Sequence, residues 1–341
     1  MVALAADESI GKCADIDDDA ARLACYDRAA GRSPASPSPS LESPRRSSVE
    51  PGEAQTQPNN AVRPTMPVPP ESAVGPSLSK VWELDAADKL GTFRLVPHKL
   101  NYLLPVRWTT RTNTLPSSPA PDHGVGAALP IDSTEAKFQI SLKFKAAQNL
   151  FGDNGDLWFG YTQQSNWQLY NGAVSSPFRE TDYEPEAILA LRTDGDLLGW
   201  RWRSLNLGLV HQSNGRPLPV SRNWNRVYAQ FGLERGDFTL LARPWIRVPE
   251  KADKDDNPDI RDYLGSGDLR LAYASAGQVY SLLGRYSFSG RRGALQFEWA
   301  YPIAGALKGY VQLTSGYGET LVDYNHSQNT IGIGLLFVPW Q

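Results

Sequence analysis

A histidine, a serine and an asparagine lie near one another in the stretch LNLGLVHQSNGRPLPVSRNWNRVYAQFGL, residues 205–233. A serine hydroxyl becomes a nucleophile when an adjacent base takes its proton. A histidine can be that base near neutral pH, provided that a third group holds its ring in place. His211 could therefore activate Ser213, and the side-chain carbonyl of Asn225 could accept a hydrogen bond from the imidazole.

A β-hairpin would position these three side chains. Side chains alternate between the two faces of a strand, so His211 and Ser213 share a face with the leucines at 205, 207 and 209. In the returning strand, Asn225 shares a face with the apolar residues at 227, 229 and 231. Antiparallel pairing across the loop would set Asn225 beside His211. Arg226 and Glu234 would take the opposite face.

Short stretches of alternating polarity fill the chain from about residue 80 to its end. Each has about ten residues, the length that a tilted strand needs to cross a bilayer. The mean hydropathy is -0.41, and no run approaches the roughly 18–20 apolar residues of a spanning helix. We expect twelve strands, an even number as in bacterial barrels, at 99–110, 135–146, 155–166, 183–193, 200–213, 224–235, 237–248, 266–275, 278–288, 292–302, 306–317 and 329–340.

The last strand favours a transmembrane barrel over a soluble β-sandwich, the other architecture with such segments. Ile331, Ile333, Leu335 and Phe337 share one face, and Trp340 follows where an interfacial aromatic residue would lie. The chain also has 10 Trp and 14 Tyr. The expected fold is all-β, a twelve-stranded antiparallel transmembrane β-barrel. A net charge of -3 gives no indication of a nucleic-acid partner.

Residues 1–31 carry helix signals, with acidic residues first, then Ala, Leu and Arg, and Gly31 as a stop. The only cysteines, Cys13 and Cys25, lie in this segment. A disulfide formed in an oxidising compartment is favoured over two free thiols. We expect a short helical segment that contains both cysteines.

The opening MVALAADES has Ala3 and Ala5 in the A-x-A arrangement of a signal-peptide tail. This indicates either a truncated start or a nearly mature form. Residues 32–78 are dense in Pro, Ser and Gln and are expected to form a disordered linker. The barrel domain would then occupy residues 79–341.

Two interpretations of the hairpin remain open from these residues alone. Polar groups that face lipid are costly, which makes His211, Ser213 and Asn225 candidates for function. Alternatively, His211 and Ser213 merely lie at the membrane–water boundary, where polar residues are ordinary.

The segment HQSNGRPLPVSRNWNRVY closely resembles the active-site hairpin of the outer-membrane phospholipase A family. The resemblance extends over most of residues 80–341 and includes YTQQSNWQLYN, SSPFRETDYEPE, DDNPDI and SGYGETLVDYN. It implies a twelve-stranded barrel whose calcium-dependent homodimer hydrolyses phospholipids and lysophospholipids. The barrel would lie in the bacterial outer membrane, with its active site at the outer leaflet and its N-terminal segment in the periplasm.

The resemblance also assigns roles to individual residues. His211 would be the base, Ser213 the nucleophile and Asn225 the orienting residue. The backbone N–H of Gly215 would suit a developing oxyanion, since glycine permits close approach.

The cofactor implied by the resemblance is Ca²⁺. Its ligands would be the carbonyl of Arg216, the hydroxyl of Ser221 and Ser175 of the partner subunit. Leu218 stands where family members can carry an aspartate, which puts a second, dimer-independent calcium site in doubt.

The acidic stretch EKADKDDNPD could compensate for Leu218 through Asp255, Asp256 or Asp259. It lacks the spacing of an EF-hand loop, however. A solvated surface loop is therefore the preferred interpretation.

Gln163 follows Leu157, Phe159 and Tyr161 on one face and would point towards lipid. An amide there needs a partner, and the family uses a glutamine at the matching position across its dimer. The alternative is that Gln163 reaches the headgroups. The other histidines, His98, His123 and His326, share no metal-ligand spacing and are expected to be incidental.

Two further classes of protein compete with a phospholipase. One is a barrel without enzymatic activity, a small pore or a structural protein. The interior charges of Arg226 and Glu234 favour a lumen filled by side chains over an open pore. The other is a soluble β-sandwich esterase, which could be extracted from cells without detergent.

Overall fold

The computed structural model describes Cys13, residues 15–29 and residues 77–338. They belong to two compact units, Met1–Met66 and Pro67–Gln341. In the first unit, α2 (Asp19–Ala29) follows Asp18, whose carboxylate accepts a hydrogen bond from the Ala21 N–H at 2.8 Å. A disulfide joins Cys13 to Cys25, so the preference over free thiols is confirmed. The expected signal-peptide tail and nearly all of the expected linker lie outside the described residues.

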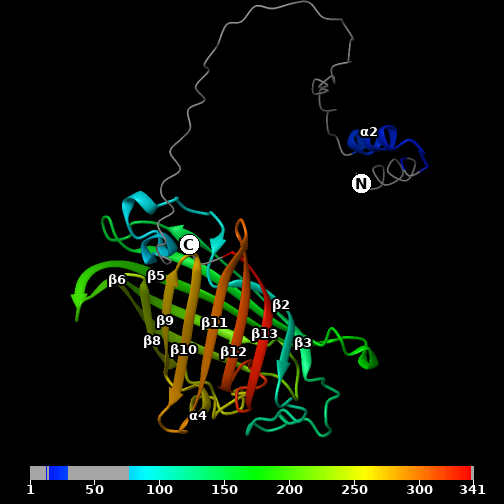
Figure 1. Cartoon of the computed structure of the whole chain (residues 1–341). Helices are drawn as coiled ribbons and strands as arrows, with labels where there is room; N and C mark the ends of the chain where they lie inside the picture. Colours follow the sequence, from blue (N-terminus) through cyan, green and yellow to red (C-terminus); the bar gives the residue numbers. More distant parts are fainter. Residues whose placement is uncertain (1–12, 14, 30–76, 339–341) are drawn as a thin grey trace, which may run out of the picture. The chain divides into compact units, whose positions relative to one another are not determined.

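Twelve long antiparallel strands of the second unit close into a barrel (Figure 1), as expected. Each pairs with the next along the chain, and β13 pairs with β2 to close the sheet. The two-residue strand β1 (Val96–Pro97) pairs with β3. The long strands are β2 (Asn101–Thr109), β3 (Thr134–Ala147), β4 (Asp156–Trp167), β5 (Phe178–Leu197), β6 (Trp200–Ser213), β7 (Asn223–Arg235), β8 (Phe238–Arg247), β9 (Gly267–Ser275), β10 (Gln278–Ser287), β11 (Arg292–Ala304), β12 (Leu307–Tyr317) and β13 (Ser327–Val338).

Helices are few and short in the described part of this unit. They are α3 (Leu78–Trp82), η1 (Ala86–Asp88), η2 (Gly172–Val174) and α4 (Arg261–Leu264). In the described parts of the chain, no helix combines the length and the apolar character that membrane crossing requires.

The two ends of the barrel differ in the length of their connections. Five connections, four of them only two residues long, form what we call the turn end: 148–155, 198–199, 236–237, 276–277 and 305–306. The connections at 110–133, 168–177, 214–222, 248–266, 288–291 and 318–326 form the loop end. Figure 1 shows α4 at the loop end, opposite the described C-terminal end of β13.

The sequence pattern gave every strand except β5 to within two residues at each end. For β5 we expected 183–193, but the strand runs from Phe178 to Leu197. Its first half carries Arg179, Glu180 and Asp182, a charge density typical of a loop. These side chains are largely buried in the lumen, where other polar groups bind them, so the strand continues through the charged segment.

The outer face of the barrel is apolar, as a membrane-spanning barrel requires. Large apolar side chains on it are exposed, among them Leu209 at 60% and Ile246 at 75%. Ile331, Ile333 and Phe337 of β13 face outward as expected. Because the sheet closes on itself, the alternative of a sandwich of two sheets is wrong.

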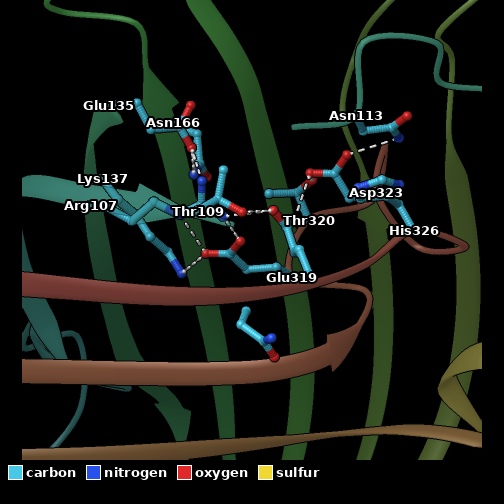
Figure 2. A network of polar contacts seen from close by, with 12 residues as sticks. Arg107, Thr109, Asn113, Glu135, Lys137, Asn166, Glu319, Thr320, Asp323 and His326 are labelled. Carbon is cyan, nitrogen blue, oxygen red and sulfur yellow. Dashed lines mark hydrogen bonds and ion pairs between the residues drawn. The ribbon is translucent and has the colours of Figure 1, made fainter. Parts of the chain in front are cut away.

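The lumen at the loop end is filled by a charged network (Figure 2). The Glu135 carboxylate binds Arg107 at 3.0 Å and Arg179 at 2.8 Å, and Arg179 also binds Asp323 at 2.8 Å. Glu319 binds Arg107 and, at 3.2 Å, Lys137. Glu319 and Asp323 come from the loop between β12 and β13, so this loop is drawn into the barrel.

Residues 78–98 close the turn end from within. Trp82 packs edge-on against Trp158, and the Lys143 Nζ lies 3.5 Å from the centroid of a Trp82 ring. The backbone N–H of Leu78 donates to Glu234 at 2.6 Å, which places Glu234 in the lumen as expected. Arg226 is also interior, 4.1 Å above the ring of Trp224. The described lumen retains a polar cavity of about 200 Å³.

Candidate active site

Strands β6 and β7 place the predicted residues on the outer face at the loop end. In the register of this pair, His211 lies opposite Asn225 and Ser213 opposite Asn223. His211 is exposed, like Leu207 and Leu209 before it, whereas the intervening residues of β6 are buried in the barrel. The parity argument from the sequence is therefore confirmed.

His211 and Asn225 are joined by a hydrogen bond. The distance from the imidazole Nδ1 to the Asn225 Oδ1 is 2.8 Å. With the amide oxygen as acceptor, Nδ1 carries the proton and Nε2 has a free lone pair. That is the tautomer that a general base needs.

Ser213 lies at the end of β6, on the face that also carries His211. It is partly buried. Within the described chain, Ser213 and His211 form no direct hydrogen bond; in free enzymes such contacts are often long and shorten when substrate binds. The structure thus brings Asn225 and His211 into contact and places the candidate nucleophile beside them.

The loop at 214–222 is organised by the buried side chain of Asn214. Its amide donates to the Glu180 Oε1 at 2.9 Å and to the carbonyl of Val220 at 2.7 Å. Its oxygen accepts the N–H of Arg222 at 3.0 Å. This network anchors the segment that follows Ser213 to the charged part of β5.

Gly215 adopts a backbone conformation that glycine favours, with φ +60°. Its N–H donates to no acceptor in the described part of the chain. An unpaired N–H two residues after a serine is a suitable donor to an oxyanion.

The expected calcium ligands lie in two loops at the loop end. The carbonyl of Arg216 accepts no hydrogen bond from the described residues. The Ser221 hydroxyl donates to the Asp256 carboxylate at 2.6 Å, which leaves its oxygen lone pairs available. Ser175 is exposed just after η2. Such oxygen donors suit a hard cation; among the described residues, no cluster of His, Cys, Asp and Glu side chains could hold a metal.

The preferred interpretation of EKADKDDNPD as a solvated loop is wrong for its second half. Asp256 accepts hydrogen bonds from Ser221 and Asn223, both at 2.6 Å, and pairs with His123 at 3.0 Å. Burial raises the pKa of the Asp256 carboxyl. The hydrogen bonds with Ser221, His123 and Asn223 outweigh this effect and hold the pKa below its usual range. Asn257 is fully buried. The loop is ordered because its carboxylate satisfies donors beside the candidate site.

Two of the histidines expected to be incidental have defined partners. His98 is buried and its Nε2 lies 2.7 Å from the Glu186 carboxylate. His123 pairs with Asp256, as described above. Among the described residues, the imidazole of His326 forms one hydrogen bond, with the carbonyl of Arg111 at 3.1 Å. These long-range partners leave no signal in a local sequence pattern.

Gln163 lies on the outer face of β4, in the row that contains Phe159 and Tyr161. Its amide makes two contacts of 3.3 Å, with the hydroxyls of Tyr161 and Ser165. Both partners lie on the same strand and in the same row as Gln163, so these contacts are consistent with an outward-facing side chain.

One residue of the site was missed by the sequence analysis. Glu250 follows the end of β8, and its Oε1 accepts a hydrogen bond from the Asn225 Nδ2 at 2.7 Å. Burial raises the pKa of the Glu250 carboxyl, although the contacts with Asn225 and Arg247 favour its charged form. Only its polar character and its position after a strand that neighbours β7 could have pointed to it.

A family model described as Phospholipase A1 matches residues 78–337. A protein of Neisseria meningitidis serogroup B is 41% identical over 348 residues, which cover 97% of this chain and 91% of that protein.

Two solved structures are similar to the barrel unit. The Salmonella typhi outer membrane phospholipase dimer with bound calcium is 36% identical with a TM-score of 0.67; the match covers 74% of this chain and 95% of that one. An asparagine-to-alanine active-site mutant of Escherichia coli outer membrane phospholipase A has the same identity and coverage and a TM-score of 0.66. From the family match and these relatives, the chain belongs to the phospholipase A1 family.

Proposed function

We propose that this protein is an outer-membrane phospholipase that hydrolyses acyl esters of phospholipids and lysophospholipids. The observation that carries the proposal is the hydrogen bond between His211 and Asn225 on the lipid-facing surface, next to Ser213. Polar groups at such a position are energetically costly, so their presence favours a function. A similar structure, the active-site mutant of Escherichia coli outer membrane phospholipase A in which an asparagine is changed to alanine, supports a role for Asn225.

The mechanism follows from the chemistry of the three side chains. The His211 Nε2 takes the proton of the Ser213 hydroxyl as its oxygen attacks the carbonyl carbon of the acyl ester. The N–H of Gly215 donates to the oxyanion that forms. His211 then protonates the departing lysolipid oxygen, and water hydrolyses the acyl-enzyme with His211 again as base. Asn225 keeps the imidazole in the required tautomer.

The residues present fit a calcium ion next to this site. The carbonyl of Arg216 and the hydroxyl of Ser221 would hold it, together with Ser175 of the partner subunit. When bound, the cation would supply positive charge close to the developing oxyanion. A calcium-bound dimer among the similar structures supports this assignment.

Dimerisation would complete the site and control activity. Gln163 projects from the apolar outer face, where its amide would bind the partner subunit. The proposal predicts that the protein sediments as a dimer in detergent when calcium and a substrate analogue are present. A monomer under those conditions, with full activity, would contradict it.

The location follows from the two ends of the barrel. Outer-membrane barrels place short turns in the periplasm and longer loops outside the cell. The candidate site is at the loop end, so its substrates would be lipids of the outer leaflet. The N-terminal segment would then lie in the periplasm.

The decisive experiment is phospholipid hydrolysis by the full chain refolded in detergent, with calcium and then with chelator. We expect calcium-dependent release of fatty acid, and loss of turnover by about 10⁴-fold or more in Ser213→Ala. Ser315→Ala is the matched control, since Ser315 likewise lies on the outer face near the loop end of its strand. Turnover by Ser213→Ala at the rate of the control would refute the assignment.

A further inference from the structure

Asn225 is held from both of its neighbouring strands. Towards β6 it contacts His211. Towards β8, its backbone carbonyl accepts the N–H of Val248 at 2.8 Å, and its Nδ2 donates to the Glu250 Oε1 at 2.7 Å. The short segment after β8 therefore fixes both the backbone and the side chain of Asn225.

The contact with Glu250 determines which way the amide of Asn225 points. A carboxylate can only accept hydrogen bonds, so it must face the NH₂ group of the amide. The amide oxygen is then directed at His211. The alternative orientation would set two acceptors, the amide oxygen and the carboxylate, against each other.

The orientation of the amide in turn selects the tautomer of His211. When the oxygen faces the ring, Nδ1 must carry the proton and Nε2 is free to act as a base. If the amide turned over, its NH₂ group would face Nδ1, which would then be the acceptor, and Nε2 would carry the proton. A histidine in that tautomer cannot take a proton from serine, and such an error is costly in triad enzymes.

We infer that Glu250 is a positioning residue of the site, which fixes the amide of Asn225 and through it the base form of His211. The inference rests on the proposed function and adds a fourth member to its chain of hydrogen bonds. Asparagine is uncharged and can present either end, so a site built on it needs an external group to define its direction. Aspartate in the same place would not.

The surroundings of Glu250 fit this role. Its Oε2 is buried and has no hydrogen-bond partner within the described chain, so the contact with Asn225 is its one hydrogen bond there. The positive charge of Arg247 on β8 favours the ionised form of the Glu250 carboxyl, while the negative charges of Asp255 and Asp256 oppose it. Arg247 itself is paired with Asp255 at 2.5 Å. Among the described residues Glu250 has no ion pair, so its hydrogen bond to Asn225 is the contact that its carboxylate position serves.

The test compares Glu250→Gln and Glu250→Leu in the refolded full chain. Glutamine has nearly the same shape but can either accept or donate, so the amide of Asn225 loses its preferred direction. We expect kcat to fall by about 10-fold in Glu250→Gln and about 100-fold in Glu250→Leu, with KM nearly unchanged. Asp253→Asn is the control, because it removes an exposed charge from the same loop.

A second readout separates positioning from a general loss of structure. The ¹⁵N NMR spectrum of labelled His211 should show the Nδ1-protonated form in the parent protein and a mixture of tautomers in Glu250→Gln. If both variants kept the parent's kcat and its single tautomer, the inference would be wrong while the phospholipase assignment stood. If Ser213→Ala stayed fully active, the assignment itself would fail.

Discussion

The lumen network and the outer-face site are both polar, but they satisfy their groups in opposite ways. In the lumen network, Glu135 contacts Arg107, Arg179 and Asn166. Arg107 and Lys137, both labelled in Figure 2, each have a carboxylate partner. On the outer face, His211 has one partner and the N–H of Gly215 has none among the described residues. Dense pairing indicates a structural role, whereas the unused hydrogen-bonding capacity beside His211 is what the proposed catalytic role requires.

The sharpest test of this contrast is His211→Ala. We expect kcat to fall by about 10³-fold or more because the serine loses its base. The melting temperature should stay within a few degrees, since the side chain is exposed and has one hydrogen bond. Fatty-acid release and thermal unfolding in detergent measure the two effects. A large loss of stability with little loss of kcat would reverse the assignment of the two regions.

The opposite result is expected for Glu135→Gln in the lumen. Removing one partner of a buried ion pair leaves charges without compensation and costs about 3–5 kcal/mol. Activity per folded molecule should change less than about twofold, because no residue of the network touches the proposed reacting atoms. Urea unfolding followed by tryptophan fluorescence, with activity normalised to folded protein, checks both. Thr330→Ala, also buried on the barrel wall, serves as a neutral control.

A smaller, pH-dependent effect is expected for Asp256→Asn at the border between the two regions. The pKa of Asp256 is lowered in the folded protein, so its contacts stabilise the protein above the usual carboxyl pKa of about 3.9. That stabilisation is lost as the pH falls through the lower folded value. The variant should therefore be about 1 kcal/mol less stable near pH 7 and match the parent once the pH lies below the folded pKa of Asp256. A difference that is the same at both pH values would contradict this account.

The sequence could predict what is local. Alternation along β6 and β7 gave the faces, the register and the contact between His211 and Asn225, because a hairpin pairs residues that are close in the chain. The resemblance to the family then supplied Ser175 and Ser221 as expected calcium ligands, which no periodicity would have selected.

What the sequence could not give depends on contacts between distant segments. The charged start of β5 was missed because its carboxylates find partners as far away as Leu321 and Asn214. Glu250 and His123 were missed for the same reason: each meets its partner through a loop whose path no local pattern defines. Polar residues on loops thus need the fold before their roles can be read.

Residues 78–98 have a consequence for the membrane that surrounds the enzyme. The Lys145 Nζ lies 2.8 Å from a carboxylate oxygen of Glu83 and 2.8 Å from one of Asp156, and the Lys143 Nζ lies against the ring of Trp82. Through these contacts the segment occupies the lumen at the turn end. The proposed active site lies on the outer face, so the proposed reaction needs no aqueous path through the lumen. We therefore expect the barrel to open no leak for ions and small solutes in the outer membrane.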